Sequence, residues 1–107
     1  MKTWVDEEGR LHREQRERDV EKKTCTYANA CGVWHTKFKS ANNRGVPDRI
    51  FIIHGETFFI EFKKPGKKTR KLQGSVIADM RAAGAQVLET DNFDEAKKYI
   101  DAFAEQW

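Results

Sequence analysis

The sequence lacks any long hydrophobic run. Its longest unbroken apolar stretches, Ile50–Ile53 and Phe58–Ile60, hold at most four residues, far below the roughly 20 that a membrane-spanning helix requires. No apolar leader precedes the charged N-terminus, so we expect no secretory signal. The mean hydropathy of -0.82 and the 35% of charged residues predict a soluble protein with no membrane partner.

Cysteine and proline are also scarce, with two of each. Cys25 and Cys31 form no CxxC pair, and on a helix side chains six residues apart diverge, so we expect no disulfide. A reducing compartment such as the cytoplasm suits free thiols. The 38% of hydrophobic residues and the lack of low-complexity tracts predict an ordered, globular chain.

The chain has 107 residues, a length that corresponds to one compact domain. Residues 1–13 are polar and aperiodic, and they predict an N-terminal arm. Residues 14–107 predict a single domain.

Positive charge is concentrated in the middle third of the chain. The net charge is +3, but residues 37–71 hold ten lysines and arginines against three acids, whereas residues 72–107 hold three against seven. A basic segment attracts polyanions, and the release of counterions from a phosphate backbone is the usual basis of nucleic-acid binding. The alternative is a solvated lysine-rich loop over residues 63–71, and charge alone does not decide between the two.

The spacing of apolar residues predicts the order helix, three strands, helix, strand, helix. A helical stripe from about Glu14 to Cys31 ends at Gly32, and the β-branched and aromatic stretch 33–38 predicts a strand. Two apolar runs, 46–53 and 57–63, flank a short turn that contains Gly55 and predict a β-hairpin covered on both faces.

The second half of the chain continues with a helix, a strand and a last helix. The first of these helices is expected to start at a Thr69 cap and end at Gly84, with a buried stripe of Leu72, Val76, Ile77, Met80 and Ala83. A strand over Gln86–Thr90 follows. The last helix is expected to be capped by Asn92 and Glu95 and to be buried through Phe93, Ala96, Ile100, Phe103 and Trp107. The predicted fold class is α/β, with a mixed central sheet flanked by helices.

The hairpin brings three charged side chains to one face of the sheet. If its turn has two or four residues, the numbers of paired residues sum to about 109 or 111, and Asp48 lies opposite Glu61 or Lys63. Two acids that converge at the edge of an apolar sheet are compensated most simply by a divalent cation. Oxygen ligands suit Mg²⁺ or Mn²⁺, and the lack of a close cluster of cysteine and histidine argues against zinc.

Such an ion orients and polarises a water that can attack a phosphodiester, and the Lys63 cation can stabilise the charge that develops on the phosphate. On the first helix, Glu17 lies within about 50° of the centre of the apolar stripe, and Glu21 within about 90°. We expect Glu17 to reach the metal directly or through water; the alternative is a glutamate that extends into solvent. Gln73, on the first turn of the next helix, can support the site or contact a nucleotide.

The stretches Gly45-Val46-Pro47-Asp48-Arg49 and Phe59-Ile60-Glu61-Phe62-Lys63, with Pro65-Gly66 and the later Gln73, resemble the PD-(D/E)xK nuclease superfamily. Within it, the match is most similar to the virus-type replication-repair nuclease (VRR-NUC) family. The resemblance runs from about Glu17 to Val87. It implies a restriction-endonuclease-like core and a DNA endonuclease that depends on Mg²⁺ or Mn²⁺.

The resemblance also implies the roles of single residues. Asp48, Glu61 and the backbone carbonyl of Phe62 would be metal ligands. Lys63 would be the catalytic lysine, and Glu17 and Gln73 would match a helix-one glutamate and a helix glutamine of the family. The basic residues that would contact DNA are Lys37, Arg44, Arg49, Lys64, Lys67, Lys68 and Arg70.

Small stand-alone members of this family look like homodimeric, structure-selective endonucleases similar to Holliday-junction resolvases. The resemblance therefore implies branched DNA as the substrate, a homodimer, and action during replication, repair or recombination in the cytoplasm of a bacterial or phage-infected cell. The alternative is a non-catalytic DNA-binding module with the same fold, but a pure binder has no need of two acids beside the phosphate. A third hypothesis is a sequence-specific restriction enzyme. It is less favoured, because so short a chain leaves little room for an insertion that contacts bases in the major groove.

Overall fold

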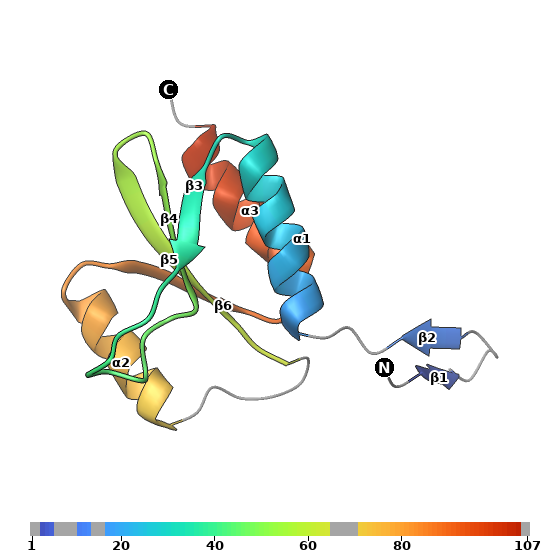
Figure 1. Ribbon diagram of the computed structural model, residues 1–107, viewed down its shortest axis with the longest axis horizontal. Helices are drawn as coiled ribbons and strands as arrows, with labels where there is room; N and C mark the ends of the chain where they lie inside the picture. Colours follow the sequence, from blue (N-terminus) through green and yellow to red (C-terminus); the bar gives the residue numbers. More distant parts are fainter. Residues whose placement is uncertain (1–2, 6–10, 14–16, 65–70, 106–107) are drawn as a thin grey trace.

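The computed structural model describes residues 3–5, 11–13, 17–64 and 71–105. Near the N-terminus, β1 (Thr3–Val5) pairs antiparallel with β2 (Leu11–Arg13). This two-stranded sheet extends beyond the N-terminal end of the first helix (Figure 1). Both strands fall within the stretch expected to form an arm, and the division of the chain into an arm and a domain stays a prediction.

The remaining elements form one α/β unit. Its elements are α1 (Glu17–Ala30), β3 (Trp34–Lys37), β4 (Arg49–Ile53), β5 (Glu56–Phe62), α2 (Lys71–Ala82), β6 (Gln86–Thr90) and α3 (Phe93–Ala104). The four-stranded sheet has the order β3-β4-β5-β6, in which the first three strands are antiparallel and β6 is parallel to β5. The predicted order α-β-β-β-α-β-α and the mixed sheet are confirmed.

Helices α1 and α3 lie side by side over one face of the sheet (Figure 1). Because side chains alternate along a strand, Phe51 of β4 and Phe58 of β5 both point to this face. Their rings stack with centroids 5.1 Å apart, and the ring of Phe103 from α3 stacks on Phe58 at 4.2 Å. The buried residues of the two helices are Val20, Thr24, Ala28, Ala96, Ile100 and Phe103. The predicted stripes therefore form the hydrophobic core.

Local signals define the ends of several elements. The side chain of Asn92 accepts a hydrogen bond from the backbone N–H of Glu95 at 2.8 Å, which confirms the predicted N-cap of α3. The hairpin turn consists of two residues, His54 and Gly55, with φ values of 53° and 75°. Two successive positive φ values are typical of a type I′ turn, whose twist matches that of the flanking strands.

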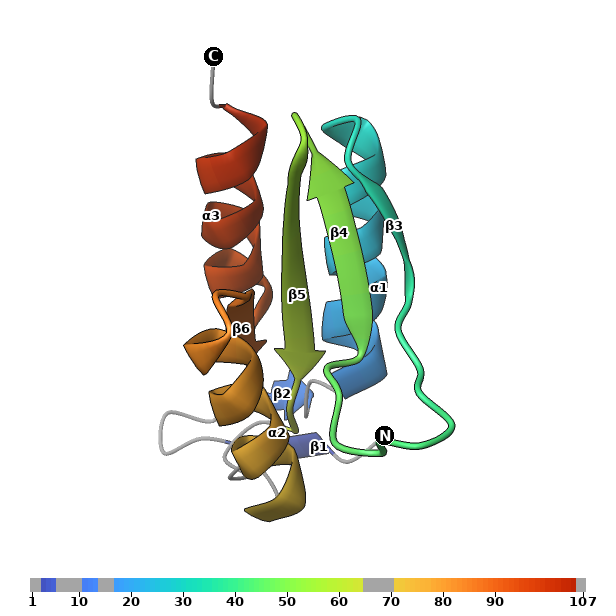
Figure 2. The ribbon, with the colours of Figure 1, turned by 90° about the vertical axis from the view of Figure 1, so that its left-hand side faces the viewer.

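The opposite face of the sheet is covered only in part, which makes the prediction of a hairpin buried on both faces wrong. Helix α2 lies across one end of this face, and the hairpin end of β4 and β5 stays uncovered (Figure 2). Trp34 and Ile52, which are paired across β3 and β4, are 58% and 37% exposed. A run of apolar residues does not distinguish one covered face from two, because only the position of the covering helix decides it.

Some predicted boundaries and buried residues also differ. Residues 46–48 form a loop before β4, and β5 begins at Glu56 because the turn has only two residues. Of the stripe predicted for this helix, only Ile77 is fully buried. Leu72 is exposed, since α2 covers the sheet at one end, and Ala83, also exposed, lies in the turn after α2. Residues 14–16, Thr69 and Trp107 lie outside the described residues.

Two sequence expectations concern cysteine and the membrane. Cys25 and Cys31 are free, as predicted. Over the described part of the chain, the helices are too short or too polar to cross a lipid bilayer.

The loop before β4 packs directly against α2 at Gly45. A Cβ atom at this position would lie 2.5 Å from Cγ2 of Val76 and 3.2 Å from the backbone oxygen of Leu72. Only a residue without a Cβ allows this approach. Gly45 therefore determines how closely the segment that leads to Asp48 lies against α2.

We predict that Gly45→Ala destabilises the protein by about 1–3 kcal/mol, because the methyl group overpacks a closed contact. Thermal unfolding followed by circular dichroism measures the loss. Val76→Ala removes Cγ2, the closest of the atoms that the new methyl group would meet. In the double variant, the loss should therefore be smaller than the sum of the two single losses. Strictly additive losses would show that the contact does not determine the position of the loop.

Candidate active site

The register of the β4–β5 hairpin places Asp48 opposite Glu61. The paired residues run from Ile53↔Glu56 to Arg49↔Ile60, so their numbers sum to 109. Asp48 precedes β4 directly, and its carbonyl accepts the N–H of Phe38 at 2.9 Å. The predicted pairing, in which the residue numbers sum to about 109 or 111, is therefore confirmed, and the partner of Asp48 is Glu61.

Each of the two acids is held by the backbone of the other strand. The N–H of Phe62 donates to Oδ2 of Asp48 at 2.9 Å, and the N–H of Asp48 donates to Oε1 of Glu61 at 3.1 Å. The side chain of Gln73, from the first turn of α2, also hydrogen-bonds to Glu61. The supporting role expected of Gln73 stays a prediction.

Burial raises the pKa of both acids. Glu61 is only 5% exposed, and desolvation together with the charge of Asp48 and a side-chain hydrogen bond with it raises the pKa of Glu61 to about 8. The hydrogen bond from Gln73 opposes this shift. Desolvation also raises the pKa of Asp48, and the negative charge of Glu21 adds to the effect. Without a bound cation, burial therefore disfavours the ionisation of both carboxyl groups.

Two adjacent carboxyl groups that are costly to ionise together form a donor set that fits a divalent cation. Mg²⁺ is held in many proteins by one or two carboxylates, while waters and substrate phosphates complete its coordination. Within residues 17–64 and 71–105, no three acid, histidine or cysteine side chains gather closely enough to hold a metal. Asp48 and Glu61 would be the side-chain ligands of Mg²⁺ or Mn²⁺ at this position, and this assignment, like that of the Phe62 carbonyl, stays a prediction.

Lys63 follows the pair at the end of β5, and its ammonium group is bound by an acid that sequence reasoning missed. Lys63 Nζ lies 3.8 Å from Oε1 of Glu89 in β6. The other oxygen, Oε2, lies 3.3 Å from Nη1 of Arg81. The register of β5 and β6, which pairs Glu61 with Glu89, carried no local signal in the sequence.

Of the two acids considered on α1, Glu21 is the one with a described connection to the site. Its Oε2 lies 2.5 Å from Nε of Arg49 and 3.7 Å from Nζ of Lys37, and its charge raises the pKa of Asp48. Glu17 is the first residue of α1 and is partly exposed. Within the described residues, Glu17 does not form a group of three possible metal ligands with Asp48 and Glu61. A role for Glu17 through water stays a prediction.

Arg49 faces α1 and not the side of the sheet that carries Asp48, since neighbouring residues on a strand point to opposite faces. Besides Glu21, its guanidinium lies 3.2 Å from Nδ1 of His35. Desolvation and the charge of Arg49 lower the pKa of His35. Arg49 thus links α1, β3 and β4, and its predicted contact with DNA stays a prediction.

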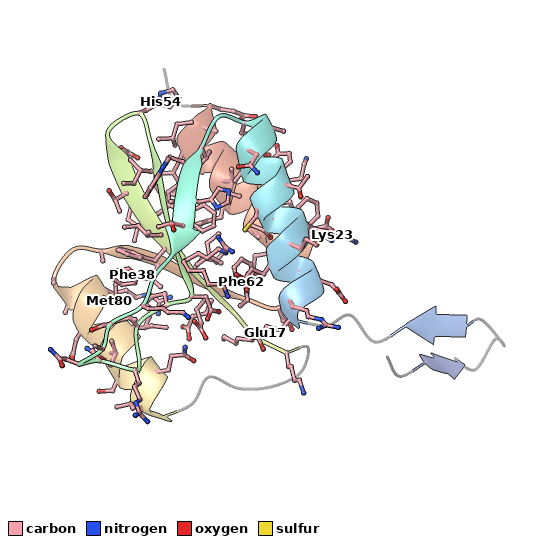
Figure 3. The ribbon with its side chains drawn as sticks, in the orientation of Figure 1. Glu17, Lys23, Phe38, His54, Phe62 and Met80 are labelled. Atoms are coloured by element: carbon pink, nitrogen blue, oxygen red, sulfur yellow. The ribbon has the colours of Figure 1, made fainter. Side chains whose placement is uncertain are left out.

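Of the other predicted DNA contacts, the described ones lie near the candidate site along the chain: Lys37 ends β3, Arg44 precedes Asp48 by four residues, and Lys64 follows Lys63. Lys37, Arg44 and Lys64 are exposed. Lys67, Lys68 and Arg70 lie outside the described residues. The hairpin turn, marked by His54, lies at the end of the sheet opposite Glu17 and Phe62 (Figure 3). His54 is therefore remote from the candidate site.

Comparisons with known proteins found a similar sequence and a similar solved structure. The chain is 36% identical over 80 residues to "Putative nuclease p44" of Acyrthosiphon pisum secondary endosymbiont phage 1; the match covers 74% of this chain and 86% of the relative. A solved structure described as "VRR_NUC domain" superposes with a TM-score of 0.74 and 27% identity, covering 81% of this chain and 96% of that chain. No family model matches the sequence. The sequence relative and the structural match together place the chain among nucleases: it belongs to the VRR-NUC family.

Proposed function

We propose that this protein is a DNA endonuclease that requires Mg²⁺ or Mn²⁺, hydrolyses phosphodiester bonds and prefers branched DNA such as four-way junctions. The observation that carries the proposal is the pair of adjacent acids, Asp48 and Glu61, at a largely buried position: Glu61 accepts the backbone N–H of Asp48, and Asp48 accepts the backbone N–H of Phe62. Membership of the VRR-NUC family supports nuclease chemistry on a nucleic acid. The preference for branched DNA rests on the resemblance to resolvase-like members of the family.

The proposed roles of the residues follow from their charges. Asp48 and Glu61 would hold a divalent cation, whose positive charge would polarise a water and a phosphate oxygen. Gln73 orients the Glu61 carboxylate. Lys63 places a further positive charge where negative charge develops on the phosphate. Exposed Arg44 and Lys64 attract the DNA backbone.

A binding module without catalysis is the competing function. Such a module would place two acids next to the phosphate that it must attract, and their negative charge opposes binding. The raised pKa of Glu61, about 8, shows how unfavourable the ionised pair is in the absence of a cation. In a nuclease, the two acids serve as a cation site, whereas in a binding module they have no use.

The first test is Asp48→Ala in a cleavage assay with labelled linear duplex, flap and four-way-junction DNA in Mg²⁺ and in Mn²⁺. We expect cleavage of the junction to fall by at least about 100-fold, with junction binding retained or strengthened because a negative charge has been removed. Asp79→Ala, at an exposed acid of α2, should cut like the wild type. Normal cleavage by Asp48→Ala would refute the assignment, and equal rates on duplex and junction would refute the preference for branched DNA.

The second test uses the pKa of Glu61. The folded-state pKa of about 8 lies above the ordinary value of 4.5 for a glutamate, so the folded state binds more protons between these pH values. Stability of the metal-free protein should therefore decrease as pH rises from about 5 to 8. Glu61→Gln, which stays neutral, should unfold about 5 °C higher than the wild type at pH 8.5, the shift that about 1 kcal/mol produces in a domain of this size.

Adding Mg²⁺ should raise the melting temperature of the wild type at pH 8.5 more than at pH 5.5, and should have little effect on Glu61→Gln. Glu56→Gln, at the other end of β5, serves as the control and should behave like the wild type. A wild-type melting temperature that does not respond to Mg²⁺ at either pH would contradict the proposed metal site.

We also propose that the active form is a homodimer. The Asp48–Glu61 pair provides one candidate site per chain, and cutting both strands of a junction requires two sites related by twofold symmetry. The uncovered apolar pair of Trp34 and Ile52 offers a surface that a second copy can cover.

Sedimentation equilibrium at micromolar concentration should therefore give a dimer. Trp34→Ser should shift the protein towards monomer and reduce paired incision of a four-way junction, because the twofold partner is lost. Leu72→Ser, at an exposed apolar residue of α2, is the matched control and should leave the dimer intact. A wild-type monomer that cleaves junctions completely at this concentration is incompatible with the proposal.

A further inference from the structure

Glu89 lies on the same face of the sheet as the Asp48–Glu61 pair. In the parallel pairing of β5 with β6, Glu89 is the partner of Glu61, and paired residues of neighbouring strands point to the same face. Lys63 follows Glu61 by two residues, and the N–H of Lys63 donates to the carbonyl of Thr90 at 2.8 Å. The lysine is thus tied to β6 directly beyond the end of β5.

The carboxylate of Glu89 lies between two cations. One oxygen is 3.8 Å from Nζ of Lys63, and the other is 3.3 Å from Nη1 of Arg81. Nη2 of Arg81 donates in turn to the carbonyl of Val87 at 2.7 Å. The side chains of Lys63 and Glu89 are only 25% and 19% exposed. Arg81 therefore holds the side chain of Glu89 against β6 through its contact with Val87. Glu89 in turn presents a fixed negative charge to the lysine.

This arrangement matters more for the position of Lys63 than for stability. A lysine side chain is a flexible stem that carries a point charge, and it loses much rotamer freedom when it is fixed. Ion pairs near the surface contribute little to folding. A cation that stabilises a transition state, however, acts best when it is already in place before the reaction.

We propose that Glu89 is a positioning residue that holds the ammonium group of Lys63 beside the Asp48–Glu61 pair. This inference rests on the catalytic role of Lys63 in the proposed function. Glu89 acts through the lysine and not as a third metal ligand, because each of its oxygens already faces a cation. It also forms no cluster of three metal-binding side chains within the described part of the chain.

A direct test measures the motion of Lys63 by ¹³C relaxation of the Cε methylene group in lysine-labelled protein. The Lys63 signal is identified by its loss in Lys63→Ala. In Glu89→Gln, which keeps the shape but removes the charge, the order of this methylene group should fall. Glu56→Gln, a strand glutamate at the far end of β5, should leave it unchanged. Equal order of Lys63 in wild type and Glu89→Gln would overturn the inference.

Single-turnover cleavage of junction DNA at saturating protein and Mg²⁺ gives a second readout. Glu89→Gln should slow cleavage by about 10-fold to 100-fold with unchanged DNA affinity, and Glu89→Asp should recover part of the rate. In the Lys63→Ala background, Glu89→Gln should cause no further loss. An equal loss in both backgrounds, or a higher Mg²⁺ requirement with an unchanged maximal rate, would overturn the inference.

The outcomes separate this inference from the proposed function. If Lys63→Ala cleaves as fast as the wild type, the catalytic role of Lys63 fails, and the positioning role of Glu89 fails with it. If Lys63→Ala is slow while Glu89→Gln keeps the wild-type rate and an ordered Lys63, only the role of Glu89 is refuted.

Discussion

The two-residue turn of the β4–β5 hairpin is the constraint on which the candidate site depends. His54 and Gly55 close the turn with positive φ values, and the resulting register makes Asp48 meet Glu61 at the other end of the hairpin. A slip of one residue would turn Glu61 to the opposite face of the sheet, into the aromatic core. The short connection at one end therefore determines which side chains meet at the other.

Because side chains alternate along the strands of the hairpin, its core residues and its candidate site residues lie on opposite faces of the sheet. One face of the hairpin carries Phe51 and Phe58, which stack with Phe103 under α1 and α3. The other face carries Asp48 and Glu61, whose burial opposes folding at neutral and alkaline pH because it raises their pKa values. Burial of the aromatic side chains on the first face stabilises the fold and offsets this electrostatic cost. Proteins commonly accept destabilising groups where function requires them.

The parts of the fold that the sequence predicts well are those that depend on neighbours along the chain. Strand β6 and the N-cap of α3 follow from local patterns, and the parity of a hairpin follows from the length of its turn. The exposure of Ile52 does not follow, because the two runs that form the β4–β5 hairpin are apolar at nearly every position and look the same with one or two covered faces. That exposure depends on α2, which covers only one end of the sheet.

The candidate site shows the same division. Asp48, Glu61 and Lys63 are recognisable in the sequence because a tight turn fixes their relation. The contact between Lys63 and Glu89 depends on the register of a parallel pair of strands joined through a helix, and no turn sets that register. The position of Glu21 beside Arg49 depends likewise on the rotation of α1 over the sheet. One signal was available: Arg49 follows Asp48 directly, so strand alternation alone turns its side chain towards the helix and away from the face where the two acids meet.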